Sequence, residues 1–403
     1  MYSLRLSPEQ IEIRNTVRDF ATREIKPAAQ SSEHMEALDR RPLWNVLDVA
    51  SDMGLRTLAL GEELGGAGAD HLTSCIVAEE LAVADPDVAA MLAETSGLGG
   101  LLFGKLLSKA QRDRFLPAFG EDRRYHLAHA ACVAQTELGS HYHDPRGGPV
   151  MTATAVRTGK HWVINGFSSD VANAPVAKLF AVSASTDPHA PGTKGASLLL
   201  VPRDAAGLTV SEHAPGRFLG CAGALTFRDC RVPADNLLSA DANAALEAAT
   251  TSGRGSPHWS AINLGIGRAA YEAAVAYAQI RVQGGRPIIQ HQAIGTKLAE
   301  CAIRLEVARG AIWKAAWAAD HPEALADLSP GDLPLETLAR AFTSEAIYRA
   351  TKDAAEVFGA MGVMRDMPLQ KFIHDARVCL HSAGGLSDAK LTIAEAIAGY
   401  RRA

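Results

Sequence analysis

One stretch near the C-terminus, IHDARVCLHSAGGLSD at residues 373–388, holds a side chain that could transfer a proton. His381 is the candidate, because an ordinary imidazole changes its charge close to neutral pH. The alternative interpretation of His381 is a polar residue at the end of a helix. Asp170, at the end of an expected strand, is a second candidate, and it could equally be a carboxylate in solvent.

A second stretch, HYHDPRGG at residues 141–148, combines His141, His143 and Asp144, which are residue types that bind zinc. Its glycines and prolines provide no fixed frame, so we expect a solvated loop and no metal. The six cysteines lie far apart and form no CxxC pair. That pattern indicates reduced thiols rather than a disulfide framework.

Composition excludes several classes of protein. The chain has 403 residues and a formal net charge of −5, with its basic residues scattered among acidic ones. Nucleic-acid binding depends on concentrated Lys and Arg, so we expect no nucleic-acid partner. The sequence shows no signal peptide and no run approaching the ~20 apolar residues of a membrane span. We therefore expect a cytoplasmic protein without a membrane partner.

The pattern of elements changes twice along the chain. Ser7, Pro8 and Gln10 predict a capped first helix that ends near Lys26-Pro27. Further helices are expected at 42–53, 70–83, 86–106 and 109–118. Alternating segments between about 126 and 235 predict strands, including a hairpin at Thr158-Gly159-Lys160. Ala-rich helices follow at about 243–283, 288–320, 334–363 and 384–400.

These elements predict an α+β fold that is mainly α. We expect an N-terminal helical domain at 1–125, a middle β-barrel or sandwich domain at 126–240, and a C-terminal four-helix bundle at 241–403. Strands and helices do not alternate, which argues against a Rossmann domain.

In this layout, the chain resembles the acyl-CoA dehydrogenase family over nearly its whole length. Six segments carry the resemblance in the family's order: LSPEQIEIRNTVRDFATREIKP, AQTELGS, WVINGF with ANAPVAKLFAV, RVPADNLL, RVQGGRPIIQHQAIGTKLAE and EVFGAMGVMRDMPLQKFIHDARV. The resemblance implies FAD as cofactor and an acyl-CoA or related thioester as substrate. In the family a Glu removes the α-proton while the β-hydrogen leaves as hydride to the flavin, a redox step that the cofactor supplies.

The resemblance also implies that the usual base is absent. Counting without gaps from His374 puts Ala383 where the family has its Glu, and alanine cannot transfer a proton. A second base position known in relatives falls on Gly255. His381 or Asp170 would then be substitutes. Asp375 and Arg377 are expected to form a structural ion pair.

The implied cofactor contacts are partly retained. Asp170, Val171 and Ala172 stand where the family has Trp-Ile-Thr or Trp-Ile-Ser beside the flavin ring, so an aromatic neighbour and a hydroxyl are lost. The other implied cofactor residues are Gln135, Thr136, Ser140, Arg281, Gln283, Gln292, Glu356 and Gly359. Among these, Glu356 replaces a frequent Gln and suits a pyrophosphate poorly unless it is protonated or paired.

Three residues are candidates for contact with the substrate: Arg254, Trp259 and Ser382. The alternative interpretations are a solvated charge for Arg254, a core residue for Trp259 and a loop residue for Ser382. A homotetramer is expected from the family. Three functions stay open: a flavoenzyme with an unusual or missing base, a base-less partner subunit in a heterotetramer with a Glu-bearing paralogue, and a repurposed or flavin-free member of the fold.

Overall fold

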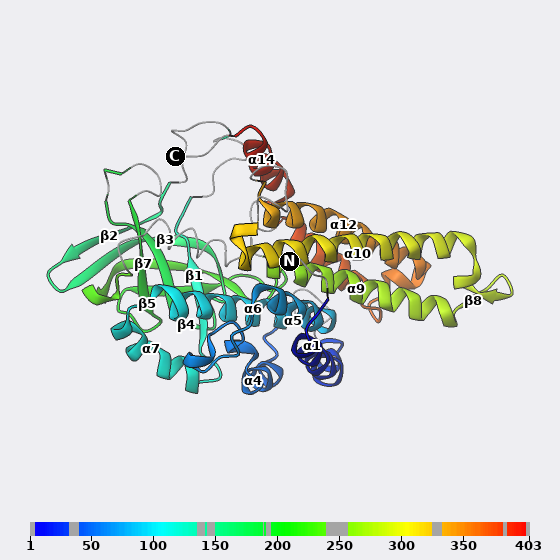
Figure 1. Ribbon diagram of the computed structural model, residues 1–403, viewed down its shortest axis with the longest axis horizontal. Coiled ribbons are helices and arrows are strands. Elements are labelled where there is room, and N and C mark those ends of the chain that lie inside the picture. The colour runs from blue at the N-terminus through cyan, green and yellow to red at the C-terminus, as the bar shows by residue number, and fades with distance from the viewer. Residues whose placement is uncertain are drawn as a thin grey trace.

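The computed structural model of the chain describes residues 5–31, 40–134, 142, 150–187, 189–190, 195–238, 257–324, 333–381 and 385–399. Within these ranges the chain forms helices first, then a sheet, then a second set of helices (Figure 1). This order confirms the predicted α+β, mainly α, fold. The exact domain boundaries stay predictions.

The N-terminal helical elements are α1 (Pro8–Phe20), a π-turn (Ala21–Ile25), α2 (Lys26–Ala29), α4 (Trp44–Asp52), α5 (His71–Ala84), α6 (Pro86–Leu101), a second π-turn (Leu102–Leu106) and α7 (Lys109–Glu121). The capping box predicted at Ser7 and Gln10 is present, since each side chain accepts from the other residue's backbone N–H. The predicted helix end at Lys26-Pro27 is wrong by about a turn. The π-turn before Pro27 changes the hydrogen-bond pattern that the proline would otherwise break.

The strands are β1 (His126–Ala130), β2 (Ala153–Thr158), β3 (His161–Ala172), β4 (Ala177–Ser185), β5 (Ala196–Pro202), β6 (Leu208–Glu212) and β7 (Ala222–Pro233). They form one mixed sheet in the order β1-β4-β2-β3-β7-β6, with β5 paired to β4. The predicted hairpin joins β2 to β3, and Gly159 takes a φ of 62° in its turn. Such a positive φ is readily adopted only by glycine.

Strands β1 and β4 are buried on both faces, because alternate side chains enter different cores. Leu127 and Leu179 pack with Phe103 and Phe119 from the N-terminal helical region. Their sequence neighbours, including Phe180, point into the opposite core together with β7. The sheet is thereby held against α6 and α7 on one side, as Figure 1 shows.

The C-terminal elements are α9 (Pro257–Ile280), β8 (Val282–Gln283), β9 (Arg286–Pro287), α10 (Gln292–Asp320), α12 (Leu335–Val357), α13 (Leu369–His381) and α14 (Gly385–Ile397). Helix α13 was not predicted as a separate helix. Its buried face includes the charged residues Lys371 and Asp375, which obscure the apolar pattern. No helix in the described ranges is long and apolar enough to cross a membrane.

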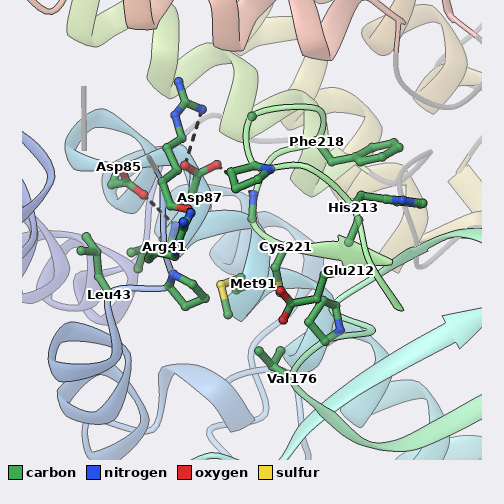
Figure 2. A pocket seen from close by; sticks show the side chains of 18 of the residues that line it. Arg41, Leu43, Asp85, Asp87, Met91, Val176, Glu212, His213, Phe218 and Cys221 are labelled. Atoms are coloured by element: carbon green, nitrogen blue, oxygen red, sulfur yellow. Dashed lines mark hydrogen bonds and ion pairs between the residues drawn. The ribbon is translucent and has the colours of Figure 1, made fainter. Parts of the chain in front are cut away.

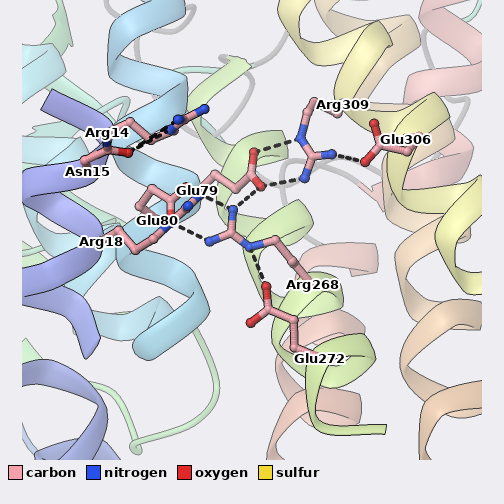
Figure 3. A network of polar contacts seen from close by, with 9 residues as sticks. All are labelled: Arg14, Asn15, Arg18, Glu79, Glu80, Arg268, Glu272, Glu306 and Arg309. Atoms are coloured by element: carbon pink, nitrogen blue, oxygen red, sulfur yellow. Dashed lines mark hydrogen bonds and ion pairs between the residues drawn. The ribbon is translucent and has the colours of Figure 1, made fainter. Parts of the chain in front are cut away.

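A buried network of charges joins the two sets of helices (Figure 3). Arg268 on α9 contacts Glu79 at 2.6 Å and Glu80 at 2.5 Å, both on α5. Arg309 on α10 also binds Glu79, and Arg18 on α1 binds Glu80. Burial opposes ionisation of Glu80, but the hydrogen bonds from Arg18 and Arg268 outweigh it and lower the carboxyl pKa. The network therefore fixes α1, α5, α9 and α10 relative to one another.

Candidate active site

Several residues of the predicted site lie outside the described parts of the chain. These are Gln135, Thr136, Ser140, Arg254, Gly255, Ser382 and Ala383, together with His141, His143 and Asp144 of the metal hypothesis. The residues on either side of these segments are described. The site is therefore built from the end of β3, the ends of α9 and α13, and the turn between β8 and β9.

Asp170, near the end of β3, is held in a network of polar contacts. Its Oδ1 lies 3.2 Å from His213 Nε2 and 3.7 Å from Arg217 Nη2, and its Oδ2 accepts a hydrogen bond from Ser169 Oγ at 3.1 Å. The interpretation of Asp170 as a solvated strand-end carboxylate is therefore wrong. His213 and Arg217 lie more than 40 residues away in sequence, and no motif marked them as partners of Asp170.

The end of β3 is anchored to α6 through Asn173. Ala172 pairs with Ala222 on β7, and the next residue, Asn173, adopts a φ of 59°. The Asn173 amide donates to Met91 O at 3.0 Å and to Thr95 Oγ1 at 3.1 Å. Asparagine tolerates this left-handed conformation better than most residues. These bonds fix the position of Ala172, which offers no hydroxyl group to a ligand.

His381 is the last residue of α13, and its side chain is exposed. About two turns earlier the same helix is firmly held. His374 Nε2 lies 2.7 Å from Gly216 O, and Asp375 is fully buried. The ion pair predicted between Asp375 and Arg377 is wrong, since Asp375 binds Arg40 at 2.6 Å and Lys371 at 2.8 Å. His381 thus lies at the C-terminal end of a fixed helix, two residues before Ala383 in the sequence.

Three of the implied cofactor residues belong to the segment around β8, which Figure 1 shows at the far end of the C-terminal helices. Arg281, Gln283 and Gln292 are all exposed there. The turn between β8 and β9 contains Gly284 and Gly285, with φ values of 61° and 80°. A ring nitrogen of His291 lies 2.9 Å from Gln283 O and holds the turn. Arginine and amide donors on an exposed tip suit an anionic ligand.

Glu356 and Gly359 lie at the C-terminal end of α12. Glu356 Oε2 is 2.5 Å from Lys297 Nζ, and this hydrogen bond raises the pKa of the lysine. The negative charge of Glu356 is therefore paired, which removes the objection that it would repel a pyrophosphate. Gly359 adopts a φ of 57° with open space around it.

Trp259 is 9% exposed and belongs to the main helical core. Beside it on α9, His258 stacks on His71 with ring centroids 5.7 Å apart. The His71 ring lies 2.5 Å from Asp320, and this hydrogen bond raises the pKa of His71. Burial lowers the pKa of His258 to about 3 and raises that of Glu336 to about 7. No sequence motif marks this cluster, because its members come from four different helices.

Whether the described residues could hold FAD depends on which hydrogen-bond donors and charges they present. The exposed tip with Arg281, Gln283 and Gln292 presents a cation and two amides, and paired Glu356 adds no free charge. These residues suit a dinucleotide pyrophosphate. At the end of β3, Asp170 and Ala172 present a carboxylate and a methyl group, and neither is an aromatic surface on which a flavin ring could stack. The described residues therefore offer more suitable contacts to the pyrophosphate of FAD than to its flavin ring.

Comparison with known protein families gives two matches. The family model for the acyl-CoA dehydrogenase N-terminal domain matches residues 7–122, and that for the acyl-CoA dehydrogenase C-terminal domain matches residues 247–398.

Curated relatives match over nearly their full length. A probable acyl-CoA dehydrogenase, YngJ, from Bacillus subtilis is 30% identical over 97% of this chain and 98% of its own. Cyclohexane-1-carbonyl-CoA dehydrogenase from Geobacter metallireducens is 33% identical over 96% of each chain.

Solved structures share the fold. Butyryl-CoA dehydrogenase from Megasphaera elsdenii aligns with a TM-score of 0.83 at 23% identity, over 98% of this chain and 100% of that one. A glutaryl-coenzyme A dehydrogenase in complex with glutaryl-CoA aligns with a TM-score of 0.85 at 24% identity, over 100% and 98%.

Proposed function

The chain belongs to the acyl-CoA dehydrogenase family, and from this premise we propose that it oxidises an acyl-CoA or related thioester with an atypical proton-transfer group. The chain is an acyl-CoA dehydrogenase-like flavoprotein, an oxidoreductase that uses FAD. The observation that carries the proposal is the family match over both helical regions, combined with alanine at position 383. FAD, when bound, accepts the hydride that leaves the substrate.

His381 is the better substitute for the missing base. The reaction needs a group that takes the α-proton while the C–C bond becomes a double bond, and an unprotonated ring nitrogen can do so near neutral pH. His381 is exposed on the last turn of α13, next to the segment that bears Ala383. Asp170 is bound by Ser169, His213 and Arg217, so we propose that it orients neighbouring groups.

The residues of the tip would hold the cofactor's pyrophosphate. Arg281, Gln283 and Gln292 are exposed, and β8, which contains Gln283, lies at the end of the C-terminal helices opposite the sheet (Figure 1). We propose that they serve the cofactor of a neighbouring subunit in a homotetramer. Gln135, Thr136, Ser140, Ala172 and Gly359 complete the proposed cofactor site, while Arg254, Trp259 and Ser382 are proposed to meet the substrate. We also propose a cytoplasmic location.

The proposal is tested by the absorption spectrum of the purified chain with FAD, followed by anaerobic bleaching with acyl-CoAs. We expect a bound-flavin spectrum that one class of thioester bleaches. His381→Ala should abolish bleaching while the flavin stays bound, and His381→Gln should do the same without changing the size of the side chain greatly. Unchanged bleaching in both variants would remove His381 from the mechanism.

A second function is supported by the same tip. A chain that lacks the base but keeps Arg281 and Gln283 could complete the site of a Glu-bearing paralogue. Arg281 and Gln283 are exposed, so another subunit could reach their donor groups. Co-expression with such a paralogue tests it. A stable mixed tetramer whose activity needs Arg281 of this chain would support the partner role, and separate elution of the two chains would oppose it.

A further inference from the structure

Two cavities of the described chain have volumes in the range of small-molecule sites. One, of about 390 Å³, lies beside α6 and the end of β3 (Figure 2), and His213 in its wall makes it part of the site already described. The other, of about 510 Å³, lies between α1, α5, α9 and α10, beside the charge network of Figure 3. None of the described residues proposed to bind substrate or cofactor lines this second cavity, so the proposed oxidation assigns no role to it.

Cations outnumber carboxylates in the wall of the second cavity. The five cations are Arg14, Arg18, Lys26, Arg268 and Arg309. The three carboxylates all pair with Arg268, at 2.6 Å for Glu79, 2.5 Å for Glu80 and 3.3 Å for Glu272. One cation remains in excess even when Glu306, which pairs with Arg309 beside the cavity, is counted. The potential in the cavity therefore favours an anionic ligand.

Two of these cations, Arg14 and Lys26, pair with no carboxylate among the residues that the structure describes. Arg14 donates only to the side-chain oxygen of Asn15, at 3.3 and 3.4 Å, which is long for a hydrogen bond. Lys26 is exposed and Arg14 is partly exposed, so both have surface that a ligand can reach. An anion that binds them does not have to displace an ion pair.

The arrangement of the cations along the chain indicates the shape of the anion. Arg14, Arg18 and Lys26 are separated by four and eight residues, a spacing that places them near one face of a helix. Arg14 and Lys26 are therefore about 18 Å apart along the helix axis, at 1.5 Å per residue. A ligand with negative charges repeated along its length matches this line better than a compact anion does.

We propose that this cavity binds a linear polyphosphate chain, either inorganic or part of a nucleoside triphosphate. Its phosphates would accept charge-assisted hydrogen bonds from Arg14 and Lys26. The base of a nucleotide would lie against Trp313, which lines the cavity from α10. This inference is independent of the proposed oxidation.

The test is isothermal titration calorimetry of the purified full-length chain, saturated with FAD, at low ionic strength and without divalent cations. The probes are tripolyphosphate, ATP and citrate, a compact anion of several charges. We expect saturable binding of tripolyphosphate and ATP, and binding of citrate at least about tenfold weaker, because citrate reaches fewer of the aligned donors. Absence of binding by both polyphosphates, or equal binding of citrate, would overturn the proposal.

Trp313→Leu distinguishes the two sources of the polyphosphate chain. Tighter binding of ATP than of tripolyphosphate, with a difference that Trp313→Leu removes, would identify the nucleotide as the ligand. Equal affinities of the two probes, unchanged in Trp313→Leu, would identify the inorganic chain.

Further variants locate the site. Arg14→Gln and Lys26→Gln should each weaken binding about tenfold through the loss of a charge-assisted hydrogen bond. Arg23→Gln is the matched control, because Arg23 is exposed in the same segment, pairs with Asp19 at 3.7 Å and lies outside the cavity wall. Unchanged binding in both test variants, or an equal loss in Arg23→Gln, would overturn the proposal. Loss of binding in Arg281→Met alone would do the same, since it would place the polyphosphate at the tip.

Discussion

Proton transfer depends on single side chains, and we propose that Ala383 occupies the position of the family's usual glutamate. Ala383→Glu would restore the family's usual carboxylate. We predict that it does not produce strong dehydrogenase activity, because the family resemblance also places Asp170 and Ala172 where an aromatic and a hydroxyl residue would adjoin the proposed ring site. Steady-state turnover of simple acyl-CoAs by the variant is the measurement. Robust turnover would contradict the argument that several positions changed together.

A second prediction at the scale of the residue concerns a buried histidine. His126 is fully buried, and burial lowers its pKa to about 4, with Thr95 Oγ1 2.9 Å from its Nδ1. The unfolded chain takes up a proton below about pH 6.5 whereas the folded chain does not until about pH 4. The contribution of the neutral His126 to the free energy of unfolding is therefore fully present above about pH 6.5 and is lost as the pH falls toward 4. At pH 5 the loss from this one group is about 2 kcal/mol.

The measurement is the thermal midpoint between pH 7.5 and pH 5. His126→Gln should reduce its dependence on pH, although it also lowers stability at pH 7.5. His161→Gln, on the exposed start of β3, is the control and should leave the slope unchanged. Equal slopes in the wild-type chain and His126→Gln would show that His126 is not held neutral.

The arrangement of helices depends on the buried charges of Figure 3. Arg268→Met would leave Glu79 and Glu80 with fewer partners in a buried position. Removing one partner from a buried ion pair costs on the order of 3–5 kcal/mol, so a large drop in thermal midpoint is expected. Arg349→Met breaks an exposed pair with Glu345 on α12 and should cost less than about 1 kcal/mol. Similar losses in the two variants would show that burial does not strengthen the network.

At the scale of the whole molecule, we propose that the exposed tip at β8 and β9 binds the cofactor of a neighbouring subunit. Arg281→Met should weaken FAD binding about tenfold through the loss of a charge-assisted hydrogen bond to the neighbouring subunit's cofactor. The thermal midpoint without FAD should not change, because Arg281 is exposed. Fluorescence titration of FAD is the measurement, with Arg228→Met, at an exposed position of β7, as control. Equal FAD affinities in the two variants would argue against a role for the tip.

Much of the fold was predictable because its signals are local. The capping box at Ser7 and Gln10 and the hairpin turn at Gly159 depend only on residues close in sequence. The alternation of side chains along the strands is equally local, and the family resemblance carried the order of the three parts. The separate helix α13 was missed, because its buried face contains Lys371 and Asp375 and so does not look apolar.

Sequence alone determined the fold class and the family, since both are written in the order and identity of the residues. Tertiary structure decided the partners of charged groups. Arg40 binds Asp375 across 335 residues, and Asp170 meets His213 only because β3, β6 and β7 are neighbours in one sheet. Electrostatic interactions depend on distance in space and on burial, and local sequence patterns specify neither.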